Sequence, residues 1–252
     1  MLRHHLCDAT WASLHARLIA IPGIWKKDPE PLRRFGEAVV YVLRAGIAWA
    51  DLPATFGEAG TAYRRFRRWA HKGLWDELFV DGIPTDALAT VMVDSTVCKA
   101  QRFASGARGG GEEALGRSRG GLTTKIHALA DALGRPLGFL LTPGQAADCR
   151  QARALLEGVP FERLIGDRGY DTNQIRDWLE EHQAEAVIPS KRNRKVPIPH
   201  HPQAYRSRYR IQNLFCRIKD YGRITLRKDK TERSYAAFLS LAFALVNIQL
   251  CP

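Results

Sequence analysis

Paired cysteines are missing from this 252-residue sequence. The five cysteines are scattered, and no two of them form a CxxC pair; they are Cys7, Cys98, Cys149, Cys216 and Cys251. Structural zinc sites and disulfide frameworks both depend on paired or regularly spaced cysteines. The sequence therefore argues against either kind of cross-link and predicts reduced thiols in a cytoplasmic protein.

Long hydrophobic runs are missing as well. The longest apolar tract covers residues 236–250, about five residues short of a membrane span, so it predicts a buried core helix and no membrane partner. Charged and histidine side chains interrupt residues 1–23, which predicts that no signal peptide is present. The glycine-rich stretch over residues 104–121 lacks the Gly-Lys-Ser/Thr ending of a Walker loop.

Positive charge, in contrast, is abundant. The formal net charge is +12 and the sequence pI is about 9.8, a balance that favours polyanionic partners and nucleic acid first. A generically basic protein without such a partner is the alternative until the charges are located. Hydrophobic residues make up 45% of the chain, enough to bury a sizeable core.

Residues 1–85 predict a small all-α region that resembles a helix-turn-helix. Apolar residues recur at helical spacing from Phe35 to Leu43 and stop at Gly46, and Thr61 can cap a later helix. That later helix carries a basic cluster, Arg64, Arg65, Arg67 and Arg68, beside Phe66 and Trp69. Contact with DNA is one interpretation of this pattern, and a solvated face on an ordinary helical bundle is the other.

Residues 86–252 predict an α/β core. Three strands in a meander are followed by alternating helices and strands, the order found in a ribonuclease H-like mixed sheet. Residues 104–121 are glycine-rich and basic, and we expect this stretch to form no packed element and to be mobile. A second irregular basic stretch contains Lys191, Arg192, Arg194 and Lys195, which we predict to contact DNA phosphates.

Two aspartates follow apolar runs. Asp94 is expected at the end of a strand over residues 89–96, and Asp167 follows the run from Phe161 to Ile165 before a tight turn and a helix over residues 172–183. A buried carboxylate is costly unless something pairs with it. A single strand-end aspartate is commonly a turn former, but two that meet in space predict a divalent-metal site.

A helix is predicted over residues 205–221. Tyr205, Arg208, Gln212 and Lys219 fall on one narrow stripe of it, at about 100° per residue. The opposite side carries apolar residues for packing: Ile211, Leu214, Phe215 and Ile218. A stripe that mixes Tyr, Arg, Gln and Lys is not a core face, and taken alone it could equally be a solvated one.

Together these residues resemble a known family. The sequence is similar to bacterial insertion-sequence transposases with a DDE catalytic core, of the insertion-sequence-five group. The motifs that carry the resemblance are Val93-Asp94-Ser95-Thr96, Thr124-Lys125-Ile126-His127, Gly166-Asp167-Arg168-Gly169-Tyr170-Asp171 and the Tyr, Arg, Glu, Lys signature of the helix. In this chain the glutamate of that signature is replaced by Gln212.

The resemblance implies metal-dependent phosphoryl transfer on double-stranded DNA, at the terminal inverted repeats of an element and at its target. It implies that Asp94, Asp167 and the position of Gln212 form the catalytic site, with Asp94 and Asp167 binding Mg²⁺ or Mn²⁺. Tyr205, Arg208 and Lys219 would contact DNA near that site. A homodimer in the cytoplasm, associated with the nucleoid, is also implied.

Gln212 keeps alternatives open. A catalytically inactive DNA-binding derivative or regulator is one, and a metal-dependent nuclease without strand transfer is another. The sequence does not distinguish a natural glutamine from an engineered one.

Overall fold

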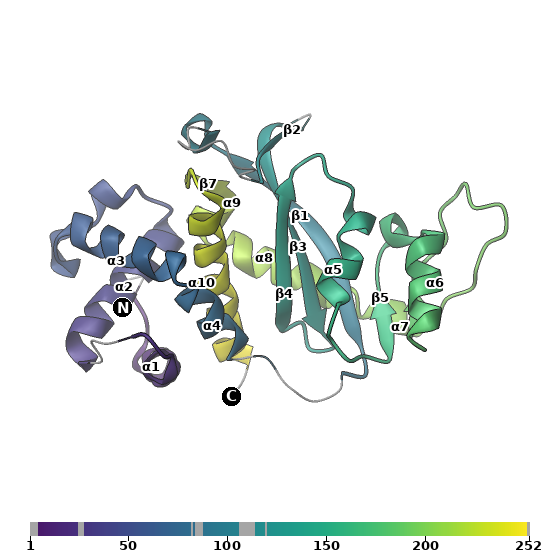
Figure 1. Ribbon diagram of the computed structural model, residues 1–252, viewed down its shortest axis with the longest axis horizontal. Helices are drawn as coiled ribbons and strands as arrows, with labels where there is room; N and C mark the ends of the chain where they lie inside the picture. The colour runs from purple at the N-terminus through teal and green to yellow at the C-terminus, as the bar shows by residue number, and fades with distance from the viewer. Residues whose placement is uncertain are drawn as a thin grey trace.

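The computed structural model describes residues 5–24, 28–81, 83, 88–105, 114–118 and 120–250 (Figure 1). Helices of the N-terminal part lie on one side, a mixed sheet lies on the other, and the C-terminal helix α10 (Glu232–Leu250) runs between them. The elements of the N-terminal part are α1 (Asp8–Ala20), α2 (Pro29–Ala45), η1 (Trp49–Asp51), η2 (Ala54–Phe56), α3 (Ala59–His71) and α4 (Leu74–Val80).

Helix α2 ends where the sequence predicts. Gly46 adopts a left-handed conformation with φ of 64°, which glycine tolerates at little cost. A Cβ at this position would lie 2.7 Å from the backbone of Gly222. Only glycine therefore lets the end of α2 pack closely against the backbone at Gly222.

Helix α3 begins differently from the prediction. The cap is Glu58 instead of Thr61: its carboxylate accepts hydrogen bonds from the backbone amides of Gly60 and Thr61. A longer acidic side chain can satisfy the free amides of a first turn as the shorter cap residues do, and it also suits the positive end of the helix. The helix accordingly begins at Ala59.

The sheet contains strands of both directions. Its strands are β1 (Val91–Ala100), β2 (Gly116–Ser118), β3 (Gly121–Asp131), β4 (Pro136–Pro143), β5 (Arg163–Ile165), β6 (Glu185–Val187) and β7 (Leu226–Arg227). The path runs β2-β3-β1-β5-β6, with β4 also paired to β3 and β7 to β1. The β1–β3 and β3–β4 pairs are antiparallel, whereas β5 pairs in parallel with β1 and β6. The predicted meander and mixed α/β class are confirmed.

Two expectations for this part of the chain are wrong. Strand β1 continues to Ala100, so Asp94 lies inside a strand and not at its end, because β3 pairs with β1 over its whole length. The glycine-rich stretch does contribute a packed element, since β2 pairs with the start of β3. Residues 106–113 and 119 of that stretch lie outside the described residues.

The remaining helices connect and flank the strands. They are η3 (Arg102–Ser105), η4 (Asp148–Arg150), α5 (Ala152–Leu156), η5 (Arg168–Tyr170), α6 (Asn173–Glu181), α7 (Pro202–Arg206), α8 (Tyr209–Lys219), α9 (Gly222–Thr225) and α10 (Glu232–Leu250). The single helix predicted over residues 205–221 is two helices, α7 and α8, separated at Ser207 and Arg208. Its expected apolar side is buried: Ile211, Leu214, Phe215 and Ile218.

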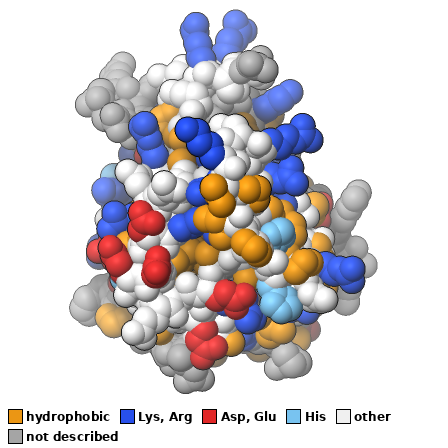
Figure 2. Space-filling view, turned by 90° about the vertical axis from the view of Figure 1, so that its right-hand side faces the viewer, with side chains coloured by type: hydrophobic (Ala, Val, Ile, Leu, Met, Phe, Trp, Pro, Cys, Tyr) orange, Lys and Arg blue, Asp and Glu red, His pale blue; other side chains and the backbone are white. Residues whose placement is uncertain are grey.

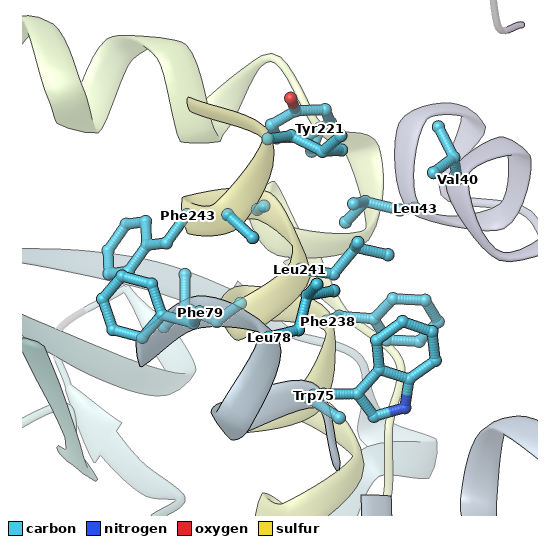
Figure 3. Close-up of a cluster of buried hydrophobic side chains, with 14 of the residues drawn as sticks. Val40, Leu43, Trp75, Leu78, Phe79, Tyr221, Phe238, Leu241 and Phe243 are labelled. Carbon is cyan, nitrogen blue, oxygen red and sulfur yellow. The ribbon is translucent and has the colours of Figure 1, made fainter. Parts of the chain in front are cut away.

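Helix α10 joins the two parts of the chain into one core. Phe238 stacks on Phe66 of α3, and Phe243 packs against both Phe79 of α4 and Phe139 of β4 (Figure 3). Within the described residues α10 is the one helix long and apolar enough to cross a membrane. Its side chains from Ala237 to Ile248 are nevertheless buried by protein, as expected for the central helix of a globular core.

A buried ion pair in the C-terminal part also donates a hydrogen bond to the N-terminal part. The Arg223 guanidinium donates to both carboxylate oxygens of Asp229, at 2.9 and 2.7 Å, and to the backbone oxygen of Ile47 at 2.9 Å. Arg223 and Asp229 are 5% and 6% exposed. Removing one partner of such a pair leaves an uncompensated charge in the core.

We predict that Asp229→Ala lowers the free energy of unfolding by about 3–5 kcal/mol, measured by urea denaturation. The control is Glu185→Ala, which removes the exposed Arg163–Glu185 pair and should cost less than about 1 kcal/mol. Equal losses in the two variants would mean that the buried Arg223–Asp229 pair contributes no more to stability than the exposed pair.

Candidate active site

A gap along one edge of β1 defines the site. Strand β5 pairs with β1 only at Val91 and Met92, and β7 pairs only at Lys99 and Ala100. Among the described residues no strand pairs with β1 between these two points on that edge. Asp94 lies in this gap, two residues beyond Met92, and Asp167 lies two residues beyond Ile165, which is the partner of Met92. The register therefore places Asp94, which lies on β1, beside Asp167, which follows the end of the adjacent strand β5 by two residues.

The two carboxylates share one guanidinium. Arg208 Nη2 lies 2.5 Å from Asp94 Oδ2 and 3.8 Å from Asp167 Oδ2. The other oxygen of each carboxylate accepts a backbone hydrogen bond, Asp94 Oδ1 from Ser95 at 2.9 Å and Asp167 Oδ1 from Gly169 at 2.7 Å. Asp167 is thus both the turn former that a single strand-end aspartate commonly is and a member of a carboxylate pair.

Burial dominates the protonation of Asp94, which is 8% exposed. Desolvation raises its pKa, Arg208 and the Ser95 amide oppose that rise, and the negative charges of Asp167 and Asp148 add to it. A carboxylate that lies beside other negative charges has an affinity for a cation that would relieve the repulsion. In this structure the guanidinium of Arg208 relieves it.

Two buried polar atoms at this site have no hydrogen-bond partner within the described part of the chain, Tyr170 Oη and Arg208 Nε. Tyr170 is 1% exposed, and its pKa is raised first by burial and then by the charges of Asp148, Asp94 and Asp167. Buried polar groups in native proteins nearly always have a partner, which can be an ordered water or a ligand. Two carboxylates beside unpaired donors fit a hydrated divalent cation and a phosphate oxygen.

Helix α8 brings the signature stripe to this gap. Arg208 precedes its first residue, and Gln212 lies one turn further along on the same side of the helix. Gln212 and Lys219 are exposed and Tyr205 is half-buried, with its ring edge-on to His200 at 5.5 Å. Of the four signature residues, Arg208 is the one that contacts the aspartates in this structure.

The basic cluster of α3 is divided between solvent and the core. Arg64, Arg67 and Arg68 are exposed. Arg65 is half-buried, with its guanidinium 4.3 Å from the centroid of the Phe35 ring and 5.0 Å from that of Trp69, a stacking arrangement that stabilises both partners. A pocket of about 570 Å³ lies along this helix, and its lining includes Arg64, Arg65, Arg68 and Lys72.

The basic stretch after β6 is also divided. Arg192 and Lys195 are exposed, but Arg194 donates to Asp171 Oδ2 at 2.9 Å, as does the Lys191 amide at 2.8 Å. Burial opposes ionisation of Asp171, yet hydrogen bonds from Arg194, Lys191 and Arg176 outweigh it and lower the pKa of Asp171 to about 2. Figure 2 presents this end of the molecule, where Lys and Arg side chains gather over the upper part of the surface.

Sequence reasoning missed one acidic residue near the pair. Asp148 lies at the start of η4, which packs against η5 beside Asp167. Its Oδ1 atom is 2.9 Å from Lys125 Nζ and 3.7 Å from His127 Nδ1. Lys125 and His127 belong to a motif of the family resemblance, but an isolated acid in a short helical segment carries no signal of its own.

Comparison with known proteins identifies the family. The "Transposase DDE domain" family matches residues 88–247, and "Putative transposase of IS4/5 family" matches residues 6–79. This chain belongs to the DDE-domain transposases. The family catalyses DNA cleavage and strand transfer with divalent metal ions.

Relatives of this transposase come from bacterial insertion sequences. A "Putative transposase for insertion sequence element IS6501" from Brucella ovis is 35% identical over 127 residues, 50% of this chain and 98% of that protein. The transposase for insertion sequence element IS1106 from Neisseria meningitidis serogroup B is 32% identical over 118 residues, 46% of this chain and 40% of that protein.

The fold is also found in a solved transposase structure. The piggyBac transposase, determined as a synaptic complex with hairpin DNA, superposes with a TM-score of 0.58 at 10% identity, covering 96% of this chain and 70% of that one. The likeness confirms the predicted ribonuclease H-like architecture for this insertion-sequence transposase.

Proposed function

We propose that Asp94 and Asp167 form the metal-binding half of the transposase active site and that Gln212 leaves this form deficient in DNA cleavage. The observation that supports the assignment is the shared position of the two carboxylates on Arg208 Nη2. Mg²⁺ is the proposed ion, with Mn²⁺ as a substitute, because both prefer carboxylate and water oxygens.

A divalent ion at these carboxylates would polarise the scissile phosphate and stabilise the leaving oxygen. Asp94 and Asp167 would hold it through the oxygens that now face Arg208, since their other oxygens are occupied by backbone amides. Arg208 would then be free to bind a non-bridging phosphate oxygen, a partner that suits the guanidinium fork. The unpaired Tyr170 hydroxyl can donate to the same group.

Gln212 contributes a neutral amide where the family signature has a carboxylate. An amide oxygen can coordinate a cation, but it brings no charge to neutralise it, so metal binding and transition-state stabilisation should both weaken. An inactive DNA-binding derivative is the second candidate, and this same observation favours it. A nuclease without strand transfer is a third, which the fold accommodates equally.

We predict that Gln212→Glu increases Mg²⁺- or Mn²⁺-dependent cleavage of DNA carrying the sequences that flank the gene by about a hundred- to a thousandfold. Asn213→Asp is the matched control, because it adds one negative charge at the next, exposed position of α8 and should leave the rate unchanged. Equal rates for Gln212→Glu and the parent would show that the glutamate position is misassigned. Binding by both without cleavage by either would favour the inactive derivative.

We propose that this protein binds double-stranded DNA, both at the element ends and at the target. Three regions would contact it: the basic face of α3, the exposed side chains of Arg192 and Lys195, and, near the active site, Tyr205, Arg208 and Lys219. Arg64, Arg68 and Lys72 line one pocket on α3, so they can act together on one stretch of phosphate backbone. Arg65 and Arg194 are engaged with protein partners, and we assign them supporting positions beside these contacts. Arg67 and Lys191 complete the proposed set.

We predict that Arg64→Ala/Arg68→Ala weakens DNA binding and lowers the slope of log K against log salt by about 0.9 for each phosphate that the variant no longer neutralises. Fluorescence anisotropy at several salt concentrations measures both quantities. Arg34→Ala/Arg153→Ala is the control, since it removes the same charge from exposed positions elsewhere. An unchanged slope in the α3 variant would make this face a solvated one.

We also propose a homodimer in the cytoplasm, associated with the nucleoid through DNA, because joining two element ends requires two active sites. Mass photometry of the protein with a DNA fragment carrying one element end should show complexes with two chains and two fragments. Complexes limited to one chain on one fragment at all concentrations would contradict this assembly.

A further inference from the structure

Asp171 is a buried carboxylate that the proposed mechanism does not use. It follows η5, the turn that Asp167 begins, and its side chain is enclosed by protein. Its Oδ1 atom accepts a hydrogen bond from Arg176 Nε at 2.7 Å. Its Oδ2 atom accepts one from Arg194 Nε at 2.9 Å and one from the Lys191 amide at 2.8 Å. The carboxylate thus connects α6 to the chain that follows β6.

The chain between β6 and α7 contains an arm, which we define as residues 190–198 and which extends past α6 (Figure 1). All of its residues lie in the described part of the chain, and none belongs to a helix or strand. Ser190 Oγ closes the arm at its base, since it donates to the Ile198 backbone oxygen at 3.1 Å and accepts from the Ile198 amide at 2.8 Å. The side chains that face solvent are Arg192, Asn193, Lys195, Val196 and Pro197.

Asp171 sets the direction in which the arm leaves the core. It binds the arm directly at two residues of one turn, and Arg176, which pairs with it, donates from Nη2 to the Ile188 backbone oxygen at 2.8 Å, just before the arm. The other end of η5 carries Asp167, whose carboxylate lies at the active site. One short turn therefore fixes the arm relative to Asp167.

Order in the arm has a consequence for binding. An irregular segment that is mobile when free must be ordered when it binds, and this loss of conformational freedom lowers the affinity. A segment that the protein already holds in place avoids that loss. Contacts to phosphates also fix the register and orientation of a protein on a duplex, so the direction of the arm determines where the DNA lies relative to the active site.

We propose that Asp171 is a positioning residue for DNA, which holds the arm so that Arg192 and Lys195 meet the phosphate backbone in one register relative to Asp167. The inference rests on the proposed DNA contacts of Arg192 and Lys195. It gives the buried charge of Asp171 a part in aligning the substrate, separate from the binding of metal.

The sign of the effect distinguishes positioning from charge. Asp171 is a negative charge beside a basic stretch, so electrostatics alone predicts that Asp171→Asn strengthens DNA binding. Positioning predicts the opposite. Asparagine presents an NH₂ group in place of one carboxylate oxygen, and this group cannot accept the hydrogen bonds that hold the arm. The arm then gains freedom, and DNA binding weakens.

Fluorescence anisotropy of the full chain with a duplex that carries one flank of the gene, in EDTA, tests the proposal. Asp171→Asn should bind about tenfold more weakly than the parent, and its amides over residues 190–198 should exchange hydrogen faster. Asp177→Asn is the matched control, because it removes an exposed carboxylate of α6 and should bind at least as tightly as the parent. Parental or tighter binding by Asp171→Asn would overturn the proposal.

A double-mutant cycle separates positioning from general damage. Arg192→Ala/Lys195→Ala removes the two exposed cations of the arm, so adding Asp171→Asn to it should weaken binding by less than about twofold. A further tenfold loss in that background would overturn the role of Asp171 alone. If Arg192→Ala/Lys195→Ala binds like the parent, the proposed DNA contacts of the arm are wrong, and this inference falls with them.

Ser190→Ala provides the same test without a change of buried charge. It removes the two hydrogen bonds at the base of the arm and takes the place of Asp171→Asn in the cycle if urea denaturation shows that variant to be unfolded. Ser190→Ala should weaken DNA binding in the parent and not in Arg192→Ala/Lys195→Ala. Equal effects in the two backgrounds would show that order in the arm does not contribute to DNA binding.

Discussion

The architecture depends on the burial of α10. A helix that is apolar on every side must be covered on every side, and neither the N-terminal helices nor the sheet can do this alone. Phe238 is covered by α3, and Phe243 by α4 and β4. The C-terminal segment thereby fixes the helical part against the sheet, and α8, which α10 also contacts, is positioned over β1 as a result.

The site then follows from an interruption in the sheet. β5 and β7 leave the middle of the β1 edge unpaired among the described residues, and α8 crosses this gap. Arg208 pairs with the buried carboxylate of Asp94, whose burial would be costlier without this charge, and it also lies 3.8 Å from the more exposed Asp167. In the proposed metal site, a divalent ion and the Arg208 guanidinium would compete for the oxygens of Asp94 and Asp167.

Much of this could be predicted from the sequence, and the failures have physical causes. Helix α2, the β3–β4 hairpin and the strand before Asp167 follow from local periodicity and from glycine or proline at their ends. The extension of β1 beyond Asp94 does not follow from local sequence, because β1 pairs there with β3, a strand more than twenty residues away in the chain. Helix α3 is capped by Glu58 and not by Thr61, because the longer Glu58 side chain reaches the free backbone amides of the first turn. The pairing of Arg194 with Asp171 requires segments that are distant in sequence, and the same is true of Asp148.

Gln212 raises the question of how a transposase responds to a neutral residue at the position of the signature glutamate. The affinity of a site for a cation depends on the total negative charge within a few ångströms and on the groups that hydrogen-bond to the ion's ligands and waters. It does not depend on one ligand alone. In the proposed site, the Asp94 and Asp167 carboxylates would keep part of the attraction for Mg²⁺ when the helix contributes an amide. Stabilisation of the transition state depends more strongly on geometry than cation binding does, because it requires the negative charge at one defined position. Binding of metal and cleavage of DNA are therefore expected to respond differently to the same substitution on α8.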